Sequence, residues 1–289
     1  GSPLSGLAYA GAADEDTKDA AEAEETDGPT LTIGSKAPSI DVEHWVSDGN
    51  GKFKPVTEIE ADKVYVVEFW ATWCGPCGQY GGPNFDAVLD AGKEGTLLTA
   101  MKAYSTSSTA GMGHPIYSQM TSAFGVSGIP DFWVNNTSPS TNSNSVITSA
   151  TNIQVDTASI VAGVALKKGI VGDSMQVTTK VKFFKNGDAG ADYSLAVYLV
   201  EDNITGYQLV GSTANNSYLH RNVLRGAAAT SYYGTSLNSG AAVTADTEFN
   251  NTYKIKLNPS WNTANLKAIA VIWKNGATPY RVINSNVAK

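Results

Sequence analysis

The chain has 289 residues, of which 42% are hydrophobic and 16% are charged. This composition supplies enough apolar material for a sizeable core and excludes a wholly disordered protein. The formal net charge is −7, but eight acidic residues and one lysine lie between Asp14 and Asp27, which leaves 19 acids and 19 bases elsewhere. Because the rest of the chain is neutral and has no basic cluster, we expect no nucleic-acid partner.

The longest apolar runs, around Val64–Trp70 and Ala268–Trp273, are too short to span a bilayer as a helix. Two cysteines exclude a disulfide-rich scaffold and a zinc ribbon built on two cysteine pairs. The three histidines have no ligand-like spacing, so we expect no metal site.

Residues 1–29 are predicted to form a disordered acidic tail that includes a cloning or signal remnant. Ala8-Tyr9-Ala10 has the small-x-small pattern of a signal-peptidase site. The acidic run that follows has few large apolar residues and cannot bury enough surface to fold. We therefore expect residues 1–28 to contribute nothing to the stability of the fold.

Residues 30–140 have the pattern of an α/β domain, because strand-like runs alternate with helical ones. Val64–Phe69 is almost continuously apolar, which is typical of a buried parallel strand. The other predicted elements are an apolar alternation at Ile40 and Val42 before a hairpin signal at Asp48-Gly49, a helix ending near Ala91, an apolar run over Leu97–Tyr104, a helix over Pro115–Phe124 and a strand over Asp131–Val134.

The pattern changes after this domain. Asn, Ser and Thr dominate residues 135–152, and we predict a polar linker over residues 141–154. From residue 155 to 289, period-two alternation and Asn-Gly turns predict an all-β antiparallel sandwich. The sequence thus predicts two domains joined near residues 135–155, with no sheet common to both.

The two cysteines are separated by two residues, between a predicted buried strand and a predicted helix. Cys74 would lie at the positive end of the helix dipole, which favours its thiolate and makes it the nucleophile. Cys77 would be shielded one turn later and could resolve a mixed disulfide. Glu68, on the preceding strand, would be a buried carboxylate that accepts the Cys77 proton through water. The alternatives are a purely structural disulfide and a Glu68 that faces an edge and pairs with a lysine.

The segment from Val67 to Cys77, with Trp73, Gly75 and Pro76 in the sequence Trp-Cys-Gly-Pro-Cys, resembles the active site of thioredoxin-fold oxidoreductases. Gly34-Ser35-Lys36-Ala37-Pro38 is similar to the opening of extracytoplasmic, membrane-tethered thioredoxins. Phe124–Pro130 resembles the segment that places a cis-proline beside the disulfide. The resemblance implies a substrate-binding role for Trp73, Gly75, Pro76, Ile129 and Pro130.

One feature departs from the thioredoxin pattern. Pro83 lies six residues after Cys77, where thioredoxins usually place a proline five residues after the second cysteine. Gly78, Gly81 and Gly82 precede it, and each glycine costs about 1 kcal/mol in a helix interior. We therefore expect irregular first helical turns, which puts the shielding of Cys77 in doubt.

The second half resembles the twenty-eight-kilodalton outer-membrane-protein family through Leu199–Ile204, Gln208, Tyr218–Arg225 and the hairpin that begins at Ala268. This resemblance implies a thioredoxin-like domain followed by a β-sandwich, located in the Gram-negative envelope on the periplasmic or surface side. It implies membrane contact only through a lipid anchor. It attaches no catalytic role to the sandwich, and we predict a structural role for His220.

The predicted function is that of an extracytoplasmic thiol–disulfide oxidoreductase acting through Cys74 and Cys77. The expected partners are thiol- or disulfide-bearing envelope proteins and an electron donor or acceptor protein. No cofactor is expected besides the redox-active disulfide itself. The alternative is an outer-membrane surface binding or adhesion protein with a non-catalytic disulfide.

Overall fold

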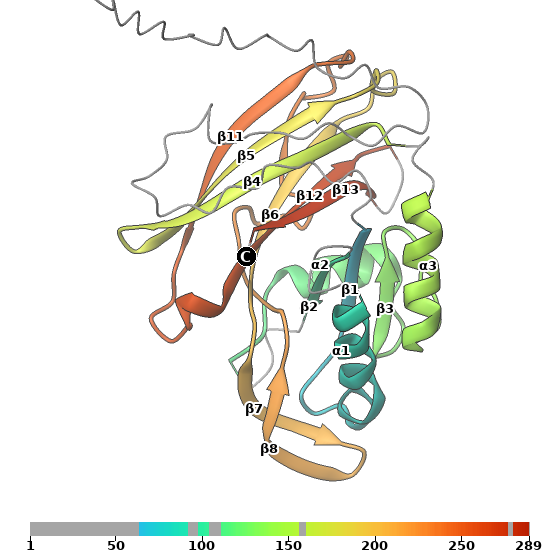
Figure 1. The fold of residues 1–289 in the computed structure, drawn as a ribbon, viewed down its shortest axis with the longest axis vertical. Coiled ribbons are helices and arrows are strands. Elements are labelled where there is room, and N and C mark those ends of the chain that lie inside the picture. The colour runs from blue at the N-terminus through green and yellow to red at the C-terminus, as the bar shows by residue number, and fades with distance from the viewer. Residues whose placement is uncertain (1–63, 92–97, 104–110, 156–159, 277–279, 289) are drawn as a thin grey trace, which may run out of the picture. The chain divides into compact units, whose positions relative to one another are not determined.

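The computed structural model describes residues 64–91, 98–103, 111–155, 160–276 and 280–288. The predicted acidic tail and the predicted hairpin at Asp48-Gly49 lie outside the described residues. In chain order (Figure 1) the elements are β1 (Val64–Phe69), η2 (Cys77–Gly81), α1 (Gly82–Ala91), β2 (Leu98–Ala103), α2 (Ile116–Phe124), β3 (Asp131–Val134), α3 (Ser143–Val155), β4 (Ala162–Val171), β5 (Ser174–Phe183), β6 (Tyr193–Glu201), β7 (Ile204–Val210), β8 (Thr213–His220), β9 (Val223–Ala227), β10 (Thr235–Ser236), β11 (Glu248–Lys256), η4 (Thr263–Asn265), β12 (Leu266–Lys274) and β13 (Arg281–Ala288).

Strand β1 is the centre of the N-terminal half. It pairs in parallel with β2 and antiparallel with β3, and all six of its residues are buried. Successive side chains of a strand point to opposite faces, so a strand covered on both faces needs an apolar residue at nearly every position. The prediction of a buried parallel strand at Val64–Phe69 is confirmed, as are the helix that ends at Ala91, the helix up to Phe124 and the strand at Asp131–Val134.

The prediction of a polar linker over residues 141–154 is wrong, because α3 occupies this segment. Asn142 accepts a hydrogen bond from the backbone N–H of Asn144 at the start of the helix. Val146 and Ala150, one turn apart, are buried against Phe85 and Val88 of α1. A short helix that covers one face of a sheet needs only this narrow apolar stripe, so its composition resembles that of a loop.

The polar residues before α3 also have a structural role. Asn135 accepts a hydrogen bond from the backbone N–H of Tyr65 and donates its own N–H to the Tyr65 carbonyl. Asn136 pairs with Val282 of β13 through its side chain alone, accepting from the backbone N–H at 2.8 Å and donating from Nδ2 to the carbonyl at 3.2 Å. These two amides therefore join β3 to β1 and to a strand from the far end of the chain.

The C-terminal half is built from antiparallel strands, as predicted. Strands β11, β5 and β4 form a three-stranded sheet that packs on strands β6 and β12. Met175, Val177, Val181 and Phe183 of β5 all point into this core, as their period-two spacing predicts. The Asn275-Gly276 signal lies between β12 and β13, which pair antiparallel.

A single sheet runs through both halves, in the order β13-β12-β6-β9-β2-β1-β3, so the prediction of two domains without a common sheet is wrong. The connection is a parallel pairing of Lys102 in β2 with Val223 in β9. Strand β6 is buried along its whole length. Its residues Leu195 and Val197 face the sandwich core, while Tyr198 and Val200 face the core of the N-terminal half.

An aromatic cluster fills the core between the two halves. Trp273 of β12 is fully buried and lies edge-on to Tyr65 of β1 and to Tyr232, with ring centroids 5.8 and 5.3 Å away. Phe124 of α2 stacks on the same indole at 6.2 Å. Aromatic contacts of this kind add to the stability gained by burying large side chains. Because the rings come from both halves of the chain, the two halves share this hydrophobic core.

Strands β7 and β8 form a separate two-stranded hairpin that extends beside the start of α1 (Figure 1). Its two ends are joined by buried charges. Asp202, just before β7, accepts hydrogen bonds from the Arg221 Nε at 2.5 Å and from the Lys267 Nζ at 2.9 Å. Next to it, Glu201 pairs with Arg225 at 3.0 Å, and Arg225 also donates to the Gly111 carbonyl. The network therefore fixes the base of the hairpin against the N-terminal half.

The charge state of Asp202 depends on this network. Burial alone would raise the pKa of Asp202, but the hydrogen bonds from Arg221 and Lys267 outweigh it and hold the pKa below its ordinary value. A depressed carboxylate pKa contributes stability above the unfolded-state pKa, and this stability is lost as the pH falls through the folded-state pKa.

We predict that Asp202→Asn lowers the free energy of unfolding at pH 7 by about 3–5 kcal/mol, because it leaves two cations without their buried partner. Asp173→Asn is the matched control, since Asp173 and Lys256 form an exposed pair at 3.8 Å and should contribute almost nothing. Urea denaturation from pH 7 to pH 3 should show the gap between wild type and Asp202→Asn narrowing as the pH falls. Equal stability of the two variants at pH 7 would contradict the network's role.

Candidate functional site

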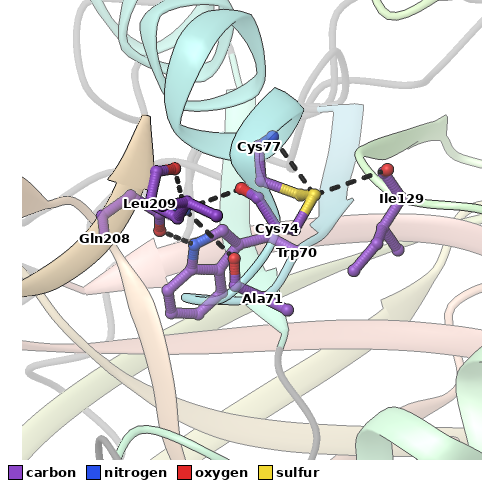
Figure 2. The surroundings of a disulfide bond; sticks show 7 residues. All are labelled: Trp70, Ala71, Cys74, Cys77, Ile129, Gln208 and Leu209. Atoms are coloured by element: carbon purple, nitrogen blue, oxygen red, sulfur yellow. Dashed lines mark hydrogen bonds between the residues drawn. A yellow bond between two sulfur atoms is a disulfide. The ribbon is translucent and has the colours of Figure 1, made fainter. Parts of the chain in front are cut away.

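The two cysteines form a disulfide at the start of the helical segment that follows β1 (Figure 2). Strand β1 ends at Phe69, and the chain turns through Thr72 and Trp73 before the helical segment begins after Pro76. The backbone N–H of Cys74 donates to the Ala71 carbonyl and closes this turn. The predicted order of buried strand, dithiol and helix is present.

Two backbone groups face the Cys74 sulfur. The N–H of Cys77 donates to the Cys74 Sγ at 3.2 Å, and the carbonyl oxygen of Ile129 lies 3.6 Å from the same sulfur. Ile129 precedes Pro130 through a cis peptide bond, as the resemblance implied. A backbone N–H and a helix N-terminus both favour a thiolate over a thiol. In the reduced chain, the Ile129 carbonyl is placed to accept the S–H of Cys74.

The position of Cys74 at a helix N-terminus predicts an exposed sulfur, and this prediction is wrong. Its exposed fraction is 5% and that of Cys77 is 1%, so both residues are buried and differ only slightly. Both pack in one cluster with Trp70, Ala71 and Val223, the last from β9 in the strand-rich half. The near neighbours of Cys74 in the chain that face solvent include Trp73, 63% exposed, and Pro76.

The expected irregularity of the first helical turns is confirmed. Cys77–Gly81 form one π-helical turn, η2, closed by a hydrogen bond from the Gly82 N–H to the Cys77 carbonyl, and α1 follows from Gly82. A π-turn accommodates one residue more than an α-turn, which fits the extra residue before Pro83. Cys77 is nevertheless shielded, so the doubt that the displaced proline raised about Cys77 is resolved.

Glu68 is fully buried on β1, as predicted. Its Oε1 lies 2.7 Å from the position that a Cβ on Gly81 would take, and the Cβ of Pro130 lies 2.8 Å from that position. The carboxylate is therefore placed between the π-turn and the cis-proline. The pKa of Tyr218 in the hairpin is raised, mainly by burial and to a smaller extent by the negative charges of Asp86 and Glu68. This phenol therefore stays neutral. The role of Glu68 as a proton acceptor stays a prediction.

The β7–β8 hairpin pairs through its backbone with the loop over residues 70–76, which holds Cys74. The N–H of Leu209 donates to the Thr72 carbonyl at 2.8 Å, and the N–H of Gly211 donates to the Gly75 carbonyl at 3.0 Å. A Cβ on Gly75 would lie 2.0 Å from the Gly211 carbonyl oxygen, and one on Gly78 would lie 2.2 Å from the Leu209 carbonyl oxygen. Glycine at these two positions is therefore what permits the hairpin to approach so closely.

The inner face of the hairpin contributes two side chains to the site. Gln208 accepts a hydrogen bond from the Trp70 Nε1 at 2.8 Å and donates to the carbonyls of Ala71 and Cys74 at 3.2 and 3.0 Å. His220 is buried between Trp70 and Tyr218, with ring centroids 5.2 and 5.0 Å away. His220 thus packs against two aromatic rings, and the structural role predicted for it stays a prediction.

Gln208 is the site residue that sequence reasoning missed. It belongs to a segment that resembles the envelope family, but it lies 134 residues from Cys74 in the chain. The sequence pattern shows only a polar residue at an inward position of a strand, and this does not indicate which residue it contacts. Within the described ranges, no three His, Cys, Asp or Glu side chains gather into a metal-ligating group.

Comparison with known families agrees with this architecture. The family model described as "Outer membrane protein Omp28" matches residues 117–289, and the chain belongs to this family. A second model, described as "Thioredoxin", matches residues 50–154. Family membership assigns the chain to the Gram-negative envelope, as predicted. None of the described helices is long and apolar enough to cross a membrane.

Individual relatives resemble parts of the chain. HBP35 of Porphyromonas gingivalis shares the fold with a TM-score of 0.60 and 19% identity, covering 78% of this chain and 74% of that one. A thioredoxin of Malassezia sympodialis is 54% identical over 39 residues, or 14% of this chain, and protein FixW of Rhizobium leguminosarum is 38% identical over 48 residues, or 17%. The matches span 34% and 20% of these two relatives' lengths.

We predict that, after reduction, Cys74 is alkylated near neutral pH while Cys77 stays protected. The Cys77 N–H and the helix terminus favour the Cys74 thiolate, whereas Cys77 lies inside the first turn. Mass spectrometry of iodoacetamide-treated protein at timed intervals measures the two rates separately. Equal rates would show that the π-turn does not protect Cys77 in solution.

We predict that Glu68→Gln slows release of a mixed disulfide on Cys74 by about 10²–10⁴-fold, the usual value of general-base assistance. The first attack by Cys74 should be nearly unchanged, and the melting midpoint should stay level or rise, because the change removes a buried ionisable group. Glu248→Gln, in a β11 residue paired with Lys180, controls for loss of a carboxylate. Unaltered release together with a lower melting midpoint would make Glu68 a structural residue.

Proposed function

We propose that the chain is a thiol–disulfide oxidoreductase of the Gram-negative envelope that exchanges disulfides with other envelope proteins through Cys74 and Cys77. The supporting observation is the surroundings of the Cys74 sulfur, which faces the Cys77 N–H and the Ile129 carbonyl at a helix N-terminus. The Cys77 N–H and the helix N-terminus favour a thiolate at Cys74, the Ile129 carbonyl is placed to accept the S–H of its thiol form, and the second sulfur lies next to it. A disulfide that serves only to join two parts of a chain needs neither feature.

In the reducing direction, the Cys74 thiolate attacks a partner disulfide. A bond forms between the Cys74 Sγ and one partner sulfur, and the other partner sulfur leaves as a thiolate with the electron pair. Cys77 then loses its proton, with Glu68 as the proposed acceptor through water, and attacks the Cys74 Sγ. The Cys74–Cys77 bond forms, and the second partner sulfur leaves as a thiolate. The chain is oxidised and the partner reduced by two electrons, and the reverse sequence oxidises a partner dithiol.

The partner would bind where the site is open. Trp73 and Pro76 are exposed beside the disulfide, and Ile129 is partly exposed next to the cis-proline. An extended partner segment could add as a strand along the Ile129 backbone, with Trp73 as an apolar contact. The partners we propose are thiol- or disulfide-bearing envelope proteins and an electron donor or acceptor protein. Electrons move between sulfur atoms, so the reaction needs no further cofactor. Membrane attachment through a lipid anchor is part of the same proposal.

One observation favours a second function, that of a surface binding or adhesion protein with a non-catalytic disulfide. The hairpin pairs with the active-site loop on the side of Thr72 and Gly75, and Cys74 is only 5% exposed. The midpoint potential of the dithiol and the turnover of a model disulfide separate the two functions. A disulfide that resists physiological reductants and turns over nothing would support the binding protein.

We predict that Cys77→Ser traps envelope proteins as mixed disulfides on Cys74, because the second attack is lost while the first remains. Adducts should appear on non-reducing gels of envelope extracts and disappear on reduction. Cys74→Ser is the matched control, since it retains one thiol in the buried position and should form no such adducts. Equal adducts with both variants, or none with either, would contradict the oxidoreductase proposal.

A further inference from the structure

All polar atoms of the Gln208 side chain contact the active-site loop or its own strand (Figure 2). The Oε1 accepts from the Trp70 indole, and the Nε2 lies within hydrogen-bond distance of the carbonyls of Ala71, Cys74 and Leu209. The side chain is fully buried. A buried amide with both ends bonded has one orientation, so Gln208 is a fixed group against the loop.

The Cys74 carbonyl is where this contact affects the dithiol. It accepts from the Gln208 Nε2 at 3.0 Å and from the Gly78 N–H of the π-turn at 3.3 Å. Fixing this oxygen fixes the peptide plane between Cys74 and Gly75, which begins the turn leading to Cys77. The same turn directs the Cys77 N–H at the Cys74 Sγ at 3.2 Å. The amide thus acts on the sulfur through the loop, without touching it.

The hairpin cannot easily move Gln208 away from the loop. The backbone bonds of Leu209 to Thr72 and of Gly211 to Gly75 hold the segment that directly follows Gln208 against the loop. The Gln208 Cγ lies 2.8 Å from the position of a Cβ on Gly78, so the side chain is in close contact with the π-turn. At the hairpin base, the Asp202–Arg221 pair closes the strands.

We propose that Gln208 is a positioning residue for the Cys74–Cys77 dithiol, supplied by the strand-rich half. Its amide holds the Cys74 carbonyl in the orientation that directs the Cys77 N–H at the Cys74 sulfur and so stabilises the thiolate. This role deepens the proposed oxidoreductase function and rests on it for its biological meaning. It also gives the strand-rich half a direct effect on the reactivity of the thioredoxin-like half.

The test compares the reduced wild type with Gln208→Ala and Gln208→Glu. Each is alkylated with iodoacetamide from pH 5 to pH 10, and the rate at Cys74 gives a pH midpoint and a plateau. Gln208→Glu keeps an acceptor oxygen for the Trp70 indole but replaces the N–H donors that bond to the carbonyls of Ala71 and Cys74. Both variants should raise the pH midpoint of Cys74 alkylation by about half a pH unit to one pH unit. At a pH below the midpoint, the alkylation rate should then be about three- to tenfold lower than in the wild type. A hairpin that had merely opened would raise the plateau and leave the midpoint in place.

Asn284→Ala is the matched structural control. Asn284 is also a buried amide that donates to a backbone carbonyl, that of Ala162 at 3.1 Å, but it lies in the β-sandwich. It should lower the melting midpoint without moving the pH midpoint. If Gln208→Ala lowers the melting midpoint in the same way and leaves the pH midpoint unchanged, the positioning role is wrong. Should Gln208→Ala fail to fold, Gln208→Met, which is similar in length and has neither an amide donor nor a charge, takes its place.

The experiment separates this inference from the proposed function. The alkylation rate of the reduced chain measures the fraction of Cys74 that is present as thiolate, and the measurement needs no partner protein. If the wild type turns over no disulfide but the Gln208 variants shift the pH midpoint, the oxidoreductase proposal fails and the positioning role stands. If the wild type turns over disulfides and the variants match it in pH midpoint and in turnover, the positioning role fails alone.

Discussion

The structure depends on strands that are buried on both faces. Strands β6 and β12 direct alternate side chains into two different cores, one inside the β-sandwich and one against β1 and α2. Each face removes large apolar side chains such as Trp273 from water, and this burial is the main favourable term in folding. The two halves cannot separate without exposing one of these cores. A thioredoxin-like half and a β-sandwich are therefore combined in one cooperative unit rather than joined by a linker.

This shared sheet determines where the β7–β8 hairpin can reach. Strand β6 ends at Glu201 and β9 begins at Val223, next to β2 of the N-terminal half, and the hairpin is the connection between them. The buried charges of Asp202 and Arg221 close its base. Its strands then extend along the active-site helix as far as the loop that holds Cys74. The segments around Glu201 and from Tyr218 to Arg225, which resemble the family, hold this hairpin in place.

The surroundings of the dithiol are consequently composed of both halves. The thioredoxin-like half supplies the dithiol, the cis-proline and the buried Glu68, and the strand-rich half supplies Gln208 and the backbone of Leu209 and Gly211. A hydrogen bond to a buried carbonyl is expensive to lose, because the oxygen is then left unsatisfied away from water. Since the indole of Trp70 and the carbonyl of Cys74 both bond to Gln208, the dithiol has a defined environment only when both halves are folded.

The sequence by itself determined the features that depend on neighbouring residues. The buried strand at Val64–Phe69, the dithiol before a helix, the irregular turn before Pro83 and the alternation in β5 follow from local spacing and from propensities that act over a few residues. The tertiary structure alone decided the common sheet, the helix in place of the predicted linker and the contact of Gln208 with Trp70, 138 residues apart. These features arise from the pairing of distant segments. The uninterrupted apolar runs of β6 and β12 indicate burial on both faces, but no local pattern states which surface each face will cover.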